Sequence, residues 1–196
     1  MSSRKRAMLP QKTEQQKRNE AIMIWGAIAA GVVILAVLLV VTLREPAPLE
    51  GLARIAGLLR EHDDEITYPE SDLPPAGGVH ASEWQNCGLY DTPIELKNAL
   101  HSLEHGAVWL TYQPELAAGD VERLQGIVRE ETDGYVLMSP FPGQRSPVVL
   151  TAWGIQLEVD SARDGRISEF IAKYQQGIQT PERGASCTDG VGEPLQ

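Results

Sequence analysis

The chain has 196 residues, enough for one membrane anchor and one domain of ordinary size. It carries 17 basic and 27 acidic residues, a formal net charge of −10 at pH 7. This acidic balance argues against a nucleic-acid partner, because phosphate contacts need Lys and Arg. Residues 1–20 nevertheless hold six basic and two acidic residues, a net of +4 that leaves −14 for the remainder. A charge split this sharp indicates membrane topology.

The first predicted element is a transmembrane helix over residues 21–43, a run of 23 residues without a charge. A helix of this length spans the ~30 Å hydrocarbon core of a bilayer. Lys17 and Arg18 precede it, so the positive-inside rule keeps residues 1–20 as a cytoplasmic tail and sends the rest of the chain out of the cytoplasm. A cleaved signal peptide has an apolar core of only about 7–15 residues and small residues at the cut site. We therefore expect an uncleaved anchor in the cell membrane, with the lipid bilayer as its partner.

Residues 44–72 are predicted to be a linker that contains a short amphipathic helix. This helix rests on apolar residues at helical spacing, namely Leu49, Leu52, Ile55, Leu58 and Leu59. Residues 62–65 and 68–78, which begin in the linker and run past it, make a polar loop punctuated by Pro and Gly. The extracytoplasmic domain itself is expected over residues 73–190.

Within the domain, helical and strand-like patterns alternate. The expected elements are a helix over 93–105 ended by Gly106, a strand over 107–112, a helix over 119–131, strands over 135–139, 148–153 and 155–159, and a helix over 167–174. This order predicts an α+β fold, a small sheet of about four strands covered by helices and preceded by one N-terminal transmembrane helix.

The four histidines suggest a metal site, because three of them lie within 26 residues. His101 and His105 are four residues apart, so a helix places both on one face, with Glu104 beside them. Two imidazoles at this spacing can share one divalent ion. His80, in a Gly-containing loop, can supply a third ligand, and the sequence leaves open whether His62 joins. Alternatively, the imidazoles bond to backbone carbonyls or to Glu104 and only hold the loop over the helix end.

Imidazole ligands outside the cytoplasm suit copper or zinc. A thioether from Met138 would favour copper, although a methionine that fills a gap in the core is the simpler interpretation. The string from His101 to His105 also matches H-x-x-E-H, an inverted zinc-protease pattern. That chemistry needs a third protein ligand and a bound water, and no matching distal acid follows. A zinc-dependent hydrolase is therefore the least favoured hypothesis, and we expect a non-enzymatic protein.

Cys87 and Cys187 are the only cysteines. Two cysteines in an oxidising compartment usually pair. Closing a loop of this size would stabilise the fold by about 4–5 kcal/mol in the chain-entropy model. A thiolate of Cys87 as a metal ligand is the competing role, which a disulfide would prevent.

Several short strings resemble a known bacterial family. They are Pro74-Pro75, Gly78-Val79-His80, Cys87-Gly88-Leu89-Tyr90, Pro93-Ile94, His101 to Trp109 (HSLEHGAVW), Ser139 to Gly143 (SPFPG), Leu150 to Gly154 (LTAWG) and Thr180-Pro181-Glu182. Together they are similar to the domain of unknown function family 3105, and HSLEHGAVW is the most specific of them. The resemblance covers roughly residues 73–187. It implies a membrane-anchored extracytoplasmic domain and supplies no reaction.

Three functional hypotheses follow from the sequence. The first is a membrane-anchored domain that binds a transition metal, copper or zinc, through its histidine cluster. The second is a non-catalytic structural or accessory subunit of a membrane protein complex, whose histidines and cysteines only shape the fold. The third is the zinc-dependent hydrolase, with Glu104 as its base.

Overall fold

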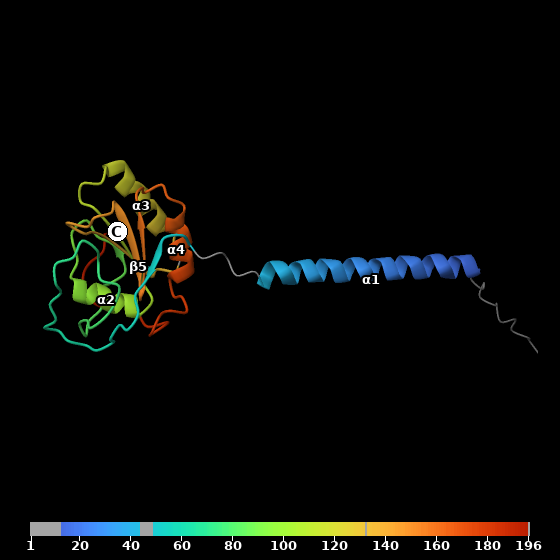
Figure 1. The fold of residues 1–196 in the computed structure, drawn as a ribbon, viewed down its shortest axis with the longest axis horizontal. Coiled ribbons are helices and arrows are strands. Elements are labelled where there is room, and N and C mark those ends of the chain that lie inside the picture. The colour runs from blue at the N-terminus through green and yellow to red at the C-terminus, as the bar shows by residue number, and fades with distance from the viewer. Residues whose placement is uncertain (1–12, 44–48, 132, 196) are drawn as a thin grey trace, which may run out of the picture. The chain divides into compact units, whose positions relative to one another are not determined.

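A computed structural model describes residues 13–43, 49–131 and 133–195 of the chain (Figure 1). The chain divides into two compact units, Met1–Pro48 and Leu49–Gln196. The first is built on one helix, and the second is a domain of helices and strands.

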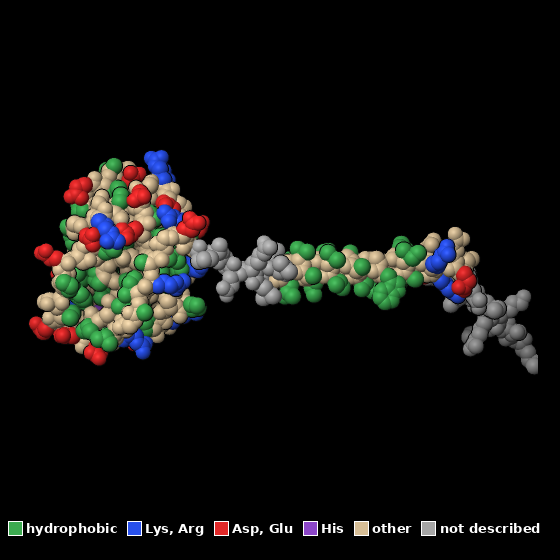
Figure 2. Space-filling model, in the orientation of Figure 1, with side chains coloured by type: hydrophobic (Ala, Val, Ile, Leu, Met, Phe, Trp, Pro, Cys, Tyr) green, Lys and Arg blue, Asp and Glu red, His purple; other side chains and the backbone are tan. Residues whose placement is uncertain are grey.

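The helix of the first unit, α1, runs over Glu14–Leu43. It is long and apolar enough to cross a membrane, as a single-pass anchor or a signal sequence would be. Figure 2 shows its hydrophobic side chains along the shaft and its charged side chains at the N-terminal end. The helix therefore begins inside the stretch that the sequence assigns to the basic tail. Residues 1–12 of that tail and residues 44–48 of the predicted linker lie outside the described residues.

The second unit is organised around a six-stranded mixed sheet. Its strands are β1 (Leu52–Arg54), β2 (Gly88–Leu89), β3 (Val108–Tyr112), β4 (Val136–Pro140), β5 (Val148–Ala152) and β6 (Ile155–Val159). Their spatial order is β1-β6-β5-β3-β4-β2. The pairs β3–β4 and β2–β4 are parallel, and the other neighbours are antiparallel. The predicted α+β class is confirmed, and the sheet is larger than the four strands expected.

The two additional strands, β1 and β2, are short and lie at the edges of the sheet. β1 falls where the sequence predicted an amphipathic helix, and from Leu49 to Asp72 the described chain has no helix. Leu52 pairs with Leu157 of β6 and packs against the core there. The apolar spacing of residues 49–59 would support only a short helix, and a short helix is marginally stable without a surface to pack on. Pairing of residues 52–54 with the edge of the sheet is therefore preferred.

Three helices cover both faces of this sheet: α2 (Leu96–Glu104), α3 (Ala118–Glu130) and α4 (Arg166–Tyr174). Side chains alternate across a strand, and the central strand β3 shows the consequence. Val108 and Leu110 belong to the core cluster that includes residues of α3 and α4, whereas Trp109 belongs to the cluster that includes α2. Helix α2 therefore lies on the opposite face from α3 and α4.

Helix α2 is short and almost entirely buried, since every residue from Asn98 to Glu104 is inaccessible to solvent. It ends at His105, and Gly106 follows with φ of 104°, a left-handed conformation that glycine adopts without strain. The Ala107 amide then donates to the carbonyl of Ser102 at 2.9 Å, and β3 begins one residue later. The C-terminal end of α2 is thereby fixed against the central strand.

The C-terminal segment returns to this end of α2. Cys187 lies at disulfide distance from Cys87, with the two Cα atoms 5.4 Å apart across 100 residues of sequence. The amide of Cys87 also donates to the carbonyl of Cys187 at 2.8 Å. Five residues earlier, the amide of Glu182 donates to the carbonyl of Glu104 at 3.0 Å. The tail therefore covers the helix that carries the predicted ligands.

Candidate metal centre

Four side chains of the domain converge on one point: His62, His80, His101 and Glu104. One ligand atom of each lies within 4.8 Å of the corresponding atoms of the other three. The ring centroids of the three histidines are 4.7 Å, 4.9 Å and 4.9 Å apart. Around a tetrahedral zinc ion with bonds of about 2.0–2.1 Å, ligand atoms are separated by roughly 3.4 Å. Small movements of the side chains would therefore bring the four ligand atoms to the separations that a metal ion requires.

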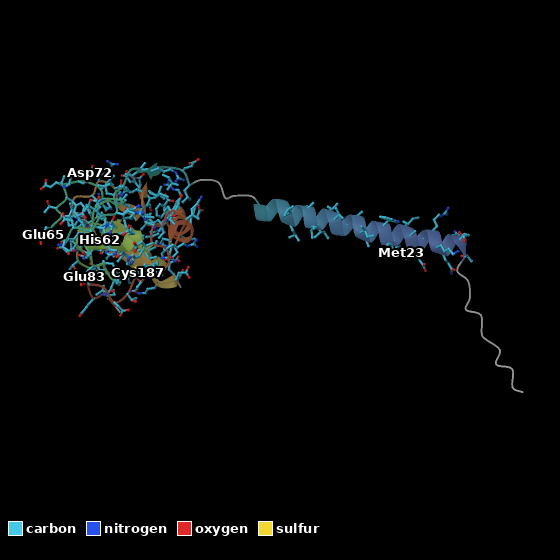
Figure 3. All side chains as sticks on the ribbon, turned by 90° about the horizontal axis from the view of Figure 1, so that it is seen from below. Met23, His62, Glu65, Asp72, Glu83 and Cys187 are labelled. Atoms are coloured by element: carbon cyan, nitrogen blue, oxygen red, sulfur yellow. A yellow bond between two sulfur atoms is a disulfide. The ribbon has the colours of Figure 1, made fainter. Side chains whose placement is uncertain are left out.

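The four residues reach this point from three places in the chain. His101 and Glu104 are three residues apart on α2, where that spacing makes them neighbours on the helix surface. His80 lies in the loop before α2, and His62 lies in the segment after β1, paired with His80 in an isolated parallel bridge. The His80 amide donates to the carbonyl of Glu61 at 3.1 Å, and the Asp63 amide donates to the carbonyl of His80 at 2.7 Å. Figure 3 labels His62 and Glu65, two exposed residues of the same loop, with Glu65 at the outer edge of the domain in this view.

Backbone carbonyls fix the orientation of two of the rings. Nδ1 of His80 lies 2.7 Å from the carbonyl oxygen of Gly78, and Nδ1 of His101 lies 2.8 Å from that of Ala81. A carbonyl can only accept, so Nδ1 carries the proton in both rings and Nε2 of each neutral ring keeps its lone pair. Metal-binding histidines commonly use this arrangement, in which one nitrogen donates to the backbone and the other is free to coordinate.

The contact between His80 and Glu104 is the most unusual in the group. Nε2 of His80 lies 2.9 Å from Oε2 of Glu104, and their side chains are 0% and 2% exposed. The distance is that of an ion pair, yet neither atom has a hydrogen-bond partner, because the alignment is not that of an N–H···O bond. Two electron-rich atoms thus face each other without solvent. A cation between them would satisfy both, whereas an unpaired buried polar group is costly.

His101 is held in its neutral form. Burial above all, and the nearby ring of His105 after it, lower its pKa to about 4. Its ring therefore carries no charge near neutral pH, which is the protonation state that a metal requires of a histidine ligand.

His105, which the sequence groups with the ligands, lies outside this set of four. Its Nδ1 is 2.5 Å from the carbonyl oxygen of Ser186, and its Nε2 is 3.7 Å from Oε2 of Glu182. The ring still packs against that of His101, with centroids 4.4 Å apart. Residues four apart on a helix differ by about 40° around the axis, so the rings of His101 and His105 point in different directions. The C-terminal tail contacts His105 through Ser186 and Glu182.

The two sulfur candidates also lie outside the group. Met138, on β4, is 1% exposed and belongs to the core cluster on the α3 and α4 face. Cys87 is paired with Cys187 and offers no thiolate. The donor set among the described residues thus consists of imidazole nitrogens and a carboxylate oxygen.

Two tryptophans border the histidine group. The ring centroid of Trp153 lies 5.8 Å from that of His80, and the centroid of Trp84 lies 5.7 Å from that of His101. A cleft of about 900 Å³ opens elsewhere on the domain, lined by residues such as Tyr68 and Phe141 and by none of the four converging residues. The histidine group therefore does not line that cleft.

The convergence of His62 is what the sequence could not show. His62 lies 18 residues before His80 in a polar loop, and only the bridge between the two backbones brings the rings together. Asp64, two residues after His62, helps to hold the two loops together, because its carboxylate accepts a hydrogen bond from the Ser82 amide at 2.7 Å.

Comparison with known proteins identifies the domain at the level of the family. The model of the family described as "Protein of unknown function (DUF3105)" matches residues 60–189, a range that includes His62, His80, His101 and Glu104. No curated protein and no solved structure is significantly similar to the chain. Since the match covers well over half of the residues, the chain belongs to the DUF3105 family.

Proposed function

We propose that this protein is a membrane-anchored, extracytoplasmic domain that binds a divalent transition metal, zinc or copper, through His62, His80, His101 and Glu104. One observation carries the proposal. Nε2 of His80 and Oε2 of Glu104 face each other at 2.9 Å in a buried site, where neither has a hydrogen-bond partner. A metal ion bound between these atoms would give both a partner at once.

A purely structural role explains the group less well. Two rings do bond to backbone carbonyls through Nδ1, as such a role would require. A structural cluster would also pair the second nitrogen of each ring, because buried polar atoms are nearly always satisfied. Instead, the second nitrogen of His80 is left unpaired, with Glu104 facing it and the rings of His62 and His101 close by.

The donor chemistry supports zinc or cupric ion in particular. Imidazole and carboxylate ligands suit these borderline divalent ions, whereas thiolate and thioether ligands favour cuprous ion. The nearest sulfur candidates are Met138, which is in the core, and Cys87, which is in the disulfide-distance pair.

The geometry supports binding better than hydrolysis. An inverted zinc-protease helix would place both of its histidines on the metal, with the glutamate held over a bound water. Here Glu104 stands among the ligand atoms, while His105 bonds to Ser186 of the tail.

We further infer that α1 anchors the domain, with its N-terminus in the cytoplasm. The support is the length and apolarity of α1 and the excess of Lys and Arg in residues 1–20. Reporter enzymes that fold only outside the cytoplasm should be active when fused after residue 196 and inactive when fused before residue 1. The reverse pattern would contradict this orientation, and release of a shortened soluble protein would indicate a cleaved signal sequence.

Metal content of the full-length protein, purified in detergent micelles, tests the proposed site. After incubation with zinc or cupric salt and removal of the excess, wild-type protein should retain roughly one ion per chain, as expected of a single four-ligand site. The double variant His80→Gln/His101→Gln should retain far less. The fluorescence of Trp84 and Trp153, which border the site, should respond to cupric ion in wild type and not in the double variant.

His105→Gln is the matched control, because His105 lies on the same helix and outside the four ligands. It should keep the bound ion. Circular dichroism spectra that match wild type would show that the variants fold. Equal metal retention by wild type and the folded double variant would refute the proposed site.

A further inference from the structure

The four candidate ligands differ in how firmly the fold holds them. His80, His101 and Glu104 are 0%, 5% and 1% exposed and belong to the body of the domain. His62 is exposed and lies on the segment between β1 and the bridge to His80. This same segment links β1, and through β1 the part of the chain that contains α1, to the rest of the domain.

The segment that carries His62 has little apolar contact with the domain. Residues 55–61 form no regular secondary structure, and among them only Leu58 is partly buried. Past the bridge, Asp64 accepts from the amide of Ser82 at 2.7 Å, and the Lys97 ammonium donates to the Asp64 carbonyl at 2.6 Å. Hydrogen bonds at an exposed surface hold a segment weakly, so local opening here costs less than opening of the core.

A metal ion in the site would change this balance, because it would bond to His62 and to the body at the same time. Opening of the segment would then remove one of four ligands. A ligand that binds the closed state more tightly than the open state stabilises the closed state by the same factor.

On the basis of the proposed metal site, we propose that a divalent metal ion acts as a latch on the segment before the domain, by bonding His62 to the three buried ligands. Loading with metal fixes residues 55–64 on the domain, and removal of metal releases them to open locally. The domain would thus report its metal occupancy through the segment that connects it to α1.

Limited trypsin digestion of the full-length protein in detergent micelles tests the latch. Arg60 is exposed and lies two residues before His62. Trypsin cleaves a segment faster the more often it opens locally, so the rate of cleavage after Arg60 reports opening of this segment. Zinc should slow cleavage after Arg60 about tenfold or more relative to protein in EDTA, the factor expected when the ion strongly prefers the closed state. Cleavage after Arg163, an exposed residue in the turn before α4, should change much less.

Three variants separate the latch from general stabilisation. His62→Ala keeps three ligands and should still bind zinc, more weakly, but saturating zinc should no longer protect Arg60. Asp64→Ala should be cut faster in EDTA, because it loses the bond to Ser82, and zinc should still protect it. Glu65→Ala, an exposed change on the same loop, should behave as wild type.

Each outcome bears on one of the two claims. If wild type binds zinc by equilibrium dialysis and cleavage after Arg60 keeps the same rate, the latch is wrong and the metal site stands. If zinc at saturation protects His62→Ala as fully as wild type, the latch is also wrong. If no divalent ion binds wild type, the proposed function itself fails.

Discussion

At the scale of single residues, the candidate site depends on two facing atoms, Nε2 of His80 and Oε2 of Glu104. Neither has a hydrogen-bond partner among the described residues. Because Nδ1 of His80 donates to Gly78, its Nε2 carries a lone pair when the ring is neutral. That lone pair meets Oε2 of Glu104. Either a proton or a metal ion can relieve the repulsion between them, and the two possibilities predict opposite effects of the same substitution.

Glu104→Gln should increase or preserve the stability of the metal-free protein and strongly reduce its affinity for metal. The new side-chain amide has the shape of the carboxylate and removes the negative charge that faces Nε2 of His80, which relieves an unsatisfied contact worth about 1–3 kcal/mol. The loss of the anionic ligand should weaken zinc binding by at least about tenfold. Thermal unfolding in EDTA and zinc titration measure the two effects.

If His80 and Glu104 instead form a protonated ion pair, the same change should destabilise the protein by about 3–5 kcal/mol, because one buried charge is left alone. Glu182→Gln is the matched control. Glu182 is half-exposed and faces His105, so its substitution should leave zinc affinity as in wild type.

Residue-level expectations from the sequence succeeded where they depended on local spacing. His101 and Glu104 are neighbours because the helix makes them so, and the loop of His80 returns to that helix. The direction of His105 and the approach of His62 depend on contacts with distant segments, the tail and the strand-like bridge. Contacts between distant segments produce no periodic pattern of residues, so they could not be predicted from the sequence. Whether these residues bind a metal stays a prediction.

At the scale of elements, the end of α2 sets the position of the site. Gly106 ends the helix as its sequence context predicts, and its positive φ allows the chain to turn directly into β3. The turn is also crowded, because a Cβ at this position would lie 2.5 Å from Nε2 of Gln176. That amide in turn donates to the carbonyl of His105 at 2.6 Å, so the helix end and the later loop depend on each other.

Gly106→Ala should destabilise the domain by roughly 1–3 kcal/mol, through strain at positive φ and the clash with Gln176. The melting temperature in EDTA should fall, and zinc affinity should fall with it because Glu104 is displaced. Gly126→Ala is the matched control on α3, where a Cβ meets nothing within 4 Å. It should raise stability by about 0.5–1 kcal/mol, since alanine favours a helix. Equal melting temperatures for the two variants would contradict this account of the turn.

Strongly periodic elements were predictable, and marginal ones were not. The buried strands over 108–112, 148–152 and 155–159 and the helices α3 and α4 lie within a residue or two of their predicted bounds. β1 and β2 have only three and two residues, too few for a pattern, and exist because neighbouring strands offer unpaired edges. The leucines near residue 52 therefore suggested a helix, whereas residues 52–54 form an edge strand.

At the scale of the whole molecule, the buried His101 makes stability depend on pH. Burial, together with the nearby His105, lowers the pKa of His101 to about 4 in the folded state, against about 6.5 in an unfolded chain. Between these values the unfolded chain binds more protons than the folded one, so stability falls as pH falls through this window. The loss over this whole window is at most about 3.5 kcal/mol, at about 1.4 kcal/mol per pH unit.

Urea unfolding of the metal-free protein between pH 7 and pH 5 measures this loss, in a range where most carboxylates stay ionised. His101→Gln should be less stable at pH 7 and should show a flatter dependence on pH. A wild-type stability that stays constant from pH 7 to pH 5 would contradict the assignment of a neutral His101.

The bridge between Cys87 and Cys187 gives the domain the covalent layout of a lasso. Its ring encloses every helix of the domain and the strands from β2 to β6, and its stem leads back toward α1. A single peptide-bond cut anywhere on the ring releases no fragment, so a nicked protein keeps its mass until it is reduced. His101 and Glu104 belong to the ring, whereas His62 and His80 belong to the stem. Only a break in the segment before Cys87, such as one after Arg60, separates this ring covalently from α1.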